Sequence, residues 1–281
     1  MVCLWMFWIF VQSIIRGMSM SEKITAKNLD QVIQKNKEIK QEIERCAILV
    51  RTTFNRMQVA SPPQLAIQLL RTYGLVQMPI ENPYLSGAIY VKEEKKIPFI
   101  NTAMPRVSQY FTAWHELYHL IFDMVSFDHL IENETTIEER KAEYFASKML
   151  LGNLMPYFLE LPKEMDLQSK VYNCMTIFQT PYKAVLIALY EDAVQLNNHE
   201  LMNAVKEIFD MAADDIVERF SELGLDNTLV LPSYIVDVNS LQVKIKSSEQ
   251  ARPELSYHKD NEVFLDNIIK EIKLITGELY A

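Results

Sequence analysis

Glycine and cysteine are scarce in this sequence, and long basic runs are missing from it. The chain of 281 residues has 6 Gly, 11 Pro and 3 Cys. So little Gly and Pro excludes a collagen-like or low-complexity chain, and an apolar content of 49% excludes a disordered one. The composition is that of a globular protein with one large or two modest domains.

The cysteines and the charge exclude further classes. Cys3, Cys46 and Cys174 lie far apart and are odd in number, so they indicate neither a disulfide framework nor a thiolate zinc site. We therefore expect a reducing compartment, the cytoplasm. With 28 basic and 37 acidic residues the formal net charge is -9. Because phosphate contacts need clustered Lys and Arg, we expect a protein partner and no direct nucleic-acid binding.

Residues 1–20 form an apolar prefix that departs from this composition. Thirteen of the fifteen residues Met1 to Ile15 are apolar, and the first basic residue follows the run, unlike in a secretory signal. A helix of that length reaches about 22 Å, short of a hydrocarbon core of about 30 Å. The alternatives are a start of translation at Met18 or Met20, a membrane-associated segment, or a buried apolar arm. We favour the start at Met18 or Met20 and expect no stable membrane association.

The hydrophobic pattern of the first two thirds of the chain predicts helices and one hairpin. Residues 21–60 are charged with apolar residues at helical spacing, which predicts an N-terminal helical segment. In the following domain, residues 61–196, Gly87 to Val91 and Ile97 to Asn101 are short β-type runs joined by a charged turn. The fold class expected is α+β, mainly helical, with a small antiparallel sheet.

The polar run Asn197-Asn198-His199 is the candidate boundary to a C-terminal extension, residues 197–281. This extension is expected to be mixed α/β and offers no residues of catalytic type. Its predicted elements are a helix over 204–220, a strand-like stretch over 228–245 and a terminal helix over 262–275.

A strong helical period after Pro105 predicts a buried helix, and this helix carries the HExxH pattern His115-Glu116-Leu117-Tyr118-His119. Two histidines four residues apart project from nearly the same face of a helix, so both imidazoles can bind one metal ion. Glu116 flanks that face, where a general base is needed. The alternative is that both histidines are ordinary members of an apolar stripe, but two of the five histidines in the chain fall in the motif.

A catalytic zinc ion keeps three protein ligands and one open position, so the motif requires a third ligand. The candidates are Glu138, Glu139 and Glu143 on a helix predicted over residues 136–151, and His129 before it. Glu139 and Glu143 are four apart, so one could bind the metal while the other accepts the free N–H of a ligating histidine. The alternative is a solvated helix face, and spacing alone does not choose.

Two stretches, FTAWHELYHLIFD and then EERKAEYFASKMLLG about twenty residues later, resemble the ImmA/IrrE family of metallo-endopeptidases. That family is similar to gluzincins, in which a glutamate within an E-x-x-A-[DN]-x-F-A pattern joins HExxH. The resemblance covers roughly residues 60–190. It implies a zincin-like core, with Glu139 as third ligand of one Zn²⁺ ion and Glu143 in place of the usual Asp or Asn.

The motif and the resemblance predict zinc-assisted hydrolysis of a peptide bond. Zinc held by His115, His119 and Glu139 would lower the pKa of a bound water from about 16 toward about 7. Glu116 would take the proton of that water and pass it to the leaving amine. An extended substrate could pair with the hairpin edge near Ile97 to Asn101.

A further hydrogen-bond donor for the tetrahedral oxyanion is expected. The candidates are Tyr118, Tyr144 and His129. Both tyrosines fit equally well as core residues at helical spacing, and we favour that interpretation for them.

The resemblance also implies a substrate, a helix-turn-helix repressor of a phage or mobile element, whose cleavage derepresses transcription. The alternative is a non-proteolytic regulatory module that sequesters such a repressor, as antitoxins and anti-repressors do. A third possibility is the hydrolysis of a small amide.

Overall fold

The computed structural model describes residues 24–54, 61–92, 95–123, 137–211, 215–254 and 258–277. These parts of the chain are mainly helical with one small sheet, so the expected α+β class is confirmed. The elements in chain order are α2 (Leu29–Thr53), α3 (Pro62–Thr72), β1 (Val76–Met78), β2 (Gly87–Lys92), β3 (Lys95–Asn101), α4 (Arg106–Ile121), α5 (Ile137–Leu150), α6 (Leu154–Glu160), α7 (Leu167–Phe178), α8 (Tyr182–Gln195), α9 (His199–Phe209), α10 (Ile216–Glu222), the 3₁₀ helix η3 (Asn227–Val230), α11 (Asn239–Ala251) and α12 (His258–Thr276).

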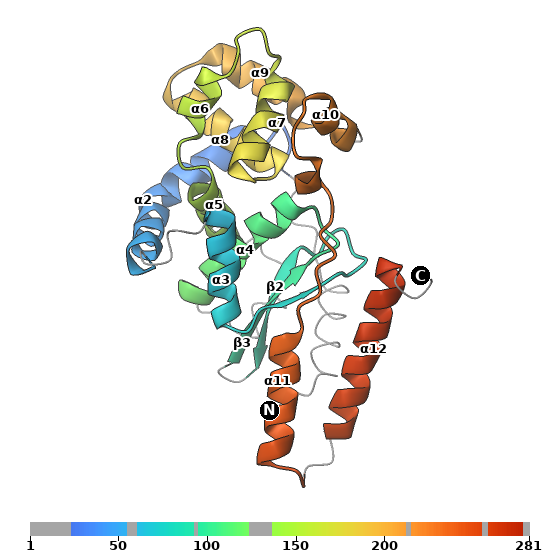
Figure 1. Cartoon of the computed structure of the whole chain (residues 1–281). Helices are drawn as coiled ribbons and strands as arrows, with labels where there is room; N and C mark the ends of the chain where they lie inside the picture. Colours follow the sequence, from blue (N-terminus) through green and yellow to red (C-terminus); the bar gives the residue numbers. More distant parts are fainter. Residues whose placement is uncertain are drawn as a thin grey trace.

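The sheet and helices α3, α4 and α5 occupy the middle of the molecule (Figure 1). Helices α6 to α10 gather at one end, and α11 and α12 pack side by side at the other. Helix α2 packs against α5 and also contacts α8. The HExxH helix α4 therefore lies between the sheet and the other central helices.

The predicted hairpin is confirmed, since β2 pairs antiparallel with β3 from Gly87 opposite Ile100 to Lys92 opposite Lys95. A third strand, β1, pairs parallel with β3, so the sheet is mixed and not purely antiparallel. The strand order is β1-β3-β2. Strand β1 has only three residues and is followed by Pro79. So short a run shows no alternation of apolar and polar residues, so the sequence does not reveal it as a strand.

Helix α4 is buried because its apolar residues recur at helical spacing and pack against the elements around it. Trp114 and Leu117 are fully buried, in one core with side chains of α2, α3, α5 and the sheet. Trp114 packs edge-on against Phe145 of α5 with ring centroids 6.0 Å apart. Full burial of each large apolar side chain contributes about 1.5–3 kcal/mol, so this core fixes α4 and α5 against each other.

A second core lies under α6 to α10 and includes the first turns of α2. The polar run predicted as a domain boundary forms the turn between α8 and α9, where Asn197 has a positive φ and Asn198 caps α9 by accepting from the Leu201 N–H. Leu189 before the turn and Val205 after it are both buried in this core.

Two predictions for the C-terminal part are wrong. The helix expected over 204–220 is two helices, α9 and α10, and the stretch expected as a strand is η3, an extended segment and the start of α11. The extended segment makes only isolated bridges, Gln77 with Asp237 and Pro105 with Pro232. Its β-branched residues thus match extended backbone, but within the described residues they join no ladder. The terminal helix is confirmed as α12.

The apolar prefix of residues 1–20 lies outside the described residues. In the parts that the structure describes, no helix combines the length and apolarity needed to cross a membrane.

Candidate metal centre

Helices α4 and α5 bring together three side chains of metal-ligand type: His115, His119 and Glu139. The Nε2 atoms of the two histidines are 3.2 Å apart. The Oε2 atom of Glu139 lies 3.3 Å from Nε2 of His115, and its Oε1 atom lies 3.4 Å from Nε2 of His119. The histidines come one turn apart from α4, and the carboxylate comes from the first turn of α5.

These separations fit a tetrahedral metal site. Ligand atoms at about 2.0–2.1 Å from a tetrahedral zinc ion are separated from one another by roughly 3.3–3.4 Å. The two Nε2 atoms are 3.2 Å apart, and each has a different oxygen of Glu139 at 3.3 or 3.4 Å; taking one ligand atom from each residue, the three atoms lie within 4.8 Å of one another. Two imidazole nitrogens and one carboxylate also form a donor set of catalytic zinc sites, with one position left for water or substrate. The residues present therefore fit the ion that the motif implies.

Asp123, which was not among the residues predicted from the sequence, orients one of the histidines. Its Oδ2 lies 2.9 Å from Nδ1 of His119, and both side chains are mostly buried. A carboxylate on Nδ1 holds the proton there and leaves Nε2 free to bind a metal. The signal was present in the sequence, because Asp123 follows His119 by four residues, a spacing at which side chains can meet, although α4 itself ends at Ile121.

The protonation of the cluster is governed by the pair His115 and Glu139. Burial lowers the pKa of His115, but the hydrogen bond and charge of Glu139 outweigh it and raise that pKa to about 9. Burial raises the pKa of Glu139, while the hydrogen bond and charge of His115 lower it to about 2. Burial and the charge of His115 lower the pKa of His119. Without a metal the cluster is thus an ion pair beside a neutral imidazole.

Glu116 lies against the sheet beside the cluster. It is 6% exposed, and burial raises the pKa of its carboxyl to about 7, although the charge of His115 lowers it. Gly87, at the start of β2, permits this arrangement: a Cβ there would lie 2.4 Å from Cγ2 of Thr112 and 2.9 Å from Oε1 of Glu116. Gly87 was not among the predicted site residues, because only the approach of β2 to α4 reveals its role.

The two tyrosines proposed as oxyanion donors have other partners. The hydroxyl of Tyr118 donates to Glu138 at 3.0 Å, and that of Tyr144 donates to Glu191 at 2.6 Å. Both rings are 1% exposed. The geometry thus supports the favoured interpretation of both as core residues. His129, the other candidate donor, lies outside the described residues.

The remaining glutamates of α5 have partners away from the histidines. Glu143 accepts from Arg140 at 2.6 Å, and in the described parts of the chain no hydrogen bond joins it to either histidine. Glu138 also accepts from Lys141 at 2.9 Å. Of the three glutamates considered as ligands, Glu139 is the one that lies beside the histidine nitrogens.

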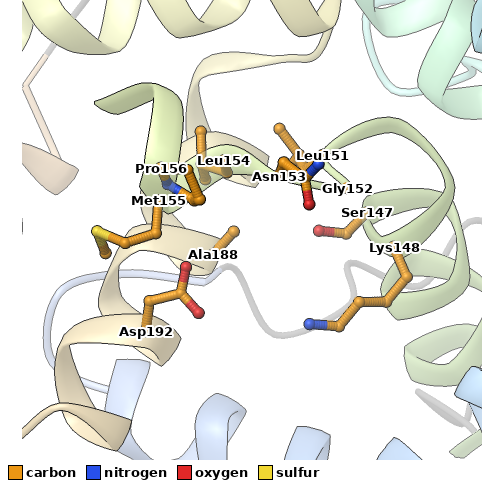
Figure 2. Close-up of a pocket in the computed structure, with 10 residues that line it drawn as sticks. All are labelled: Ser147, Lys148, Leu151, Gly152, Asn153, Leu154, Met155, Pro156, Ala188 and Asp192. Atoms are coloured by element: carbon orange, nitrogen blue, oxygen red, sulfur yellow. The ribbon is translucent and has the colours of Figure 1, made fainter. Parts of the chain in front are cut away.

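A separate pocket of about 210 Å³ lies at the C-terminal end of α5 (Figure 2). The side chains of Lys148, from α5, and Asp192, from α8, point into it. None of the three metal-binding candidates lines this pocket. It therefore plays no part in the chemistry considered for the cluster.

Comparison with known families supports the metal centre. Residues 74–190 match the model of a peptidase family, M78, described as the IrrE N-terminal-like domain. The matched segment runs from β1 into α8 and includes the whole cluster. The comparisons with curated proteins and with solved structures found no match.

Proposed function

From the match of residues 74–190 to the IrrE N-terminal-like peptidase family, we propose that the protein is a zinc-dependent endopeptidase acting on one specific protein. The observation that carries the proposal is the cluster of His115, His119 and Glu139, whose ligand atoms lie within 4.8 Å of one another beside the buried carboxyl of Glu116.

The three residues of the cluster would hold the zinc ion through the two Nε2 atoms and a carboxylate oxygen. A bound zinc ion polarises a carbonyl group and lowers the pKa of water to about 7. Asp123 keeps the proton of His119 on Nδ1, so that Nε2 stays available. His119 and Glu116 are buried, at 8% and 6% exposed, whereas the side chain of Glu139 is 53% exposed, so the site is open to solvent beside Glu139.

Glu116 acts as the general base in this proposal. A group is most effective in proton transfer when its pKa lies near the working pH, and burial brings that of Glu116 to about 7. Its carboxylate takes a proton from the attacking water and then gives it to the leaving amine. Gly87 leaves room for the carboxylate at this position.

The edge available to a substrate is β2, which corrects the expectation that Ile97 to Asn101 would provide it. Those residues belong to β3, which lies between β1 and β2 in the sheet. Strands β1 and β2 are the two edges of the sheet; β1 bridges Asp237 through Gln77, whereas within the described residues no other strand pairs with the far side of β2. An extended peptide paired with β2 would pass Gly87, next to Glu116.

The substrate proposed is a helix-turn-helix repressor of a phage or mobile element, cleaved in the cytoplasm without direct contact of the peptidase to DNA. The support for this substrate is the resemblance of the zinc-binding stretches to the ImmA/IrrE family. The net charge of -9 supports a protein substrate over a nucleic acid.

The test is to incubate the zinc-loaded protein with the repressor encoded by a neighbouring gene and to find a defined cut by mass spectrometry. Glu116→Gln should abolish the cut and retain the metal, whereas Glu139→Gln should lose metal. Glu143→Gln is the matched control on the same helix and should retain both. A repressor bound but released uncut by the wild type would favour the sequestering module, and undiminished cleavage by Glu116→Gln would exclude Glu116 as base.

A further inference from the structure

A second cavity, of about 400 Å³, lies at the N-terminal end of α4. Helix α3, strand β1 and the extended segment before α11 complete its walls. Its polar lining includes Gln68, Arg71, Gln77, Arg106, Gln109 and Ser233. Among the described residues that line it none is acidic, so the cavity has a positive charge.

Two polar groups in this lining are buried without a partner. Gln77 is 4% exposed, and its Oε1 accepts no hydrogen bond within the described residues. In the same parts of the chain, the buried Nε of Arg106 donates none. Leaving such a group unsatisfied costs about 1–3 kcal/mol, and buried groups in native proteins are nearly always paired. Two of them at one cavity indicate partners supplied from outside the chain.

A third residue of the lining, Gln109, has a buried side-chain amide whose hydrogen bonds are all made within the chain. Gln109 is also 4% exposed. Its Nε2 donates to the carbonyls of Thr102 at 3.3 Å and Met104 at 2.6 Å, and its Oε1 accepts from Ser233 Oγ at 2.8 Å. The amide of Gln109 thus holds the walls together, whereas the groups of Gln77 and Arg106 are left for a ligand.

We propose that this cavity binds a small oxyanion that also carries a hydroxyl group, with its carboxylate or phosphate held by Arg106 and its hydroxyl donating to Oε1 of Gln77. A guanidinium matches the oxygen spacing of both groups, which is why arginine is the common residue for binding them. Arg71 adds a second positive charge, although it is 55% exposed and lies 3.8 Å from Asp237. A volume of about 400 Å³ admits a small metabolite and is in the range of ligand pockets.

The proposed site is distinct from the metal centre and goes beyond the proposed peptidase function. Arg106 and His115 are nine residues apart on α4, which places them about 180° apart around the helix axis. None of the three metal-binding candidates lines the cavity. Binding can therefore be measured without reference to peptide cleavage.

The first experiment titrates the full-length protein with inorganic phosphate and, separately, with hydroxyacetate, each of which carries an O–H, by isothermal titration calorimetry. We expect saturable binding of one anion per chain, and the anion that saturates shows which head group is preferred. Arg106→Gln should weaken that binding at least tenfold. Arg219→Gln, on α10 and paired with Asp215 and Glu222, is the control and should bind as the wild type does. The absence of saturable binding of either anion, or equal binding by Arg106→Gln, would overturn the proposal.

A second variant separates binding from folding. Gln77→Leu keeps the size of the side chain and removes the unpaired amide, so it should weaken anion binding while the thermal stability of the protein is kept or raised. The main-chain bonds of Gln77 to Asp237 are unaffected by the change. A loss of stability with unchanged anion binding would show that the amide is structural and would refute the site.

Discussion

Glu139 should control the protonation of His115 in the metal-free protein. The pKa of His115 is about 9 because the hydrogen bond and charge of Glu139, with the charge of Glu116, outweigh the effect of burial. Glu139→Gln removes the two largest of the contributions that raise this pKa and leaves the burial in place. We therefore expect the substitution to lower the pKa of His115 toward its ordinary value of 6.5.

The size of the effect on metal binding follows from the raised pKa of His115 and its close contact with Glu139. His115 is 19% exposed at its side chain and lies 3.3 Å from the carboxylate. A pKa raised from 6.5 to about 9 corresponds to about 3 kcal/mol in favour of the imidazolium form. Because a metal binds only the neutral imidazole, the proton on His115 competes with it. The zinc affinity of the wild type should increase roughly 50-fold between pH 7 and pH 9 from this competition alone.

The assay is an NMR titration of the histidine ring protons in metal-free protein, with His115→Gln used to assign the signal. The wild type should titrate near pH 9 and Glu139→Gln at clearly lower pH. Glu143→Gln is the control, because the charge of Glu143 contributes less to raising the pKa of His115 than Glu139 or Glu116 does. A wild-type midpoint at or below 6.5, or the same midpoint in Glu139→Gln, would refute the reasoning.

Three further results are expected. The raised pKa of His115 stabilises the metal-free fold fully below pH 6.5, and this stability is lost as the pH rises through about 9. The temperature of thermal unfolding should therefore be lower at pH 9 than at pH 6.5, and this difference should be smaller in Glu139→Gln. Gly87→Ala should destabilise the fold by about 1–3 kcal/mol in urea unfolding, because the new Cβ overlaps its neighbours; a change below about 0.5 kcal/mol would contradict the close approach to Glu116. Asp123→Ala should weaken zinc affinity about 10–100-fold in chelator competition, and Asp123→Asn, which can still accept the hydrogen bond, should weaken it less; equal affinities would exclude the orienting role.

Helices with a strong period could be predicted from sequence, and elements held by tertiary contacts could not. Helix α4 was predicted because its apolar residues recur over four turns and become buried. Strand β1 was missed because three residues paired with a distant strand leave no local pattern. The strand expected over 228–245 failed for the opposite reason. Four of its β-branched residues lie in η3 or α11, and within the described residues the other three, Ile235, Val236 and Val238, join no ladder. A local β-type pattern forms a strand only where a neighbouring strand is available to pair with it.

The same distinction holds within the metal centre, where the two histidines could be predicted from local sequence and the third ligand could not. The distance between the Nε2 atoms of His115 and His119 is set within one helix, whose geometry brings residues four apart onto one face, so the sequence alone predicts the pair. The position of Glu139 depends on how α5 packs against α4, through contacts such as Trp114 with Phe145. Spacing therefore left Glu138, Glu139 and Glu143 as alternatives, and only the family resemblance chose among them. It follows that changes in the packing between α4 and α5 act on the third ligand, while the histidine pair keeps its spacing.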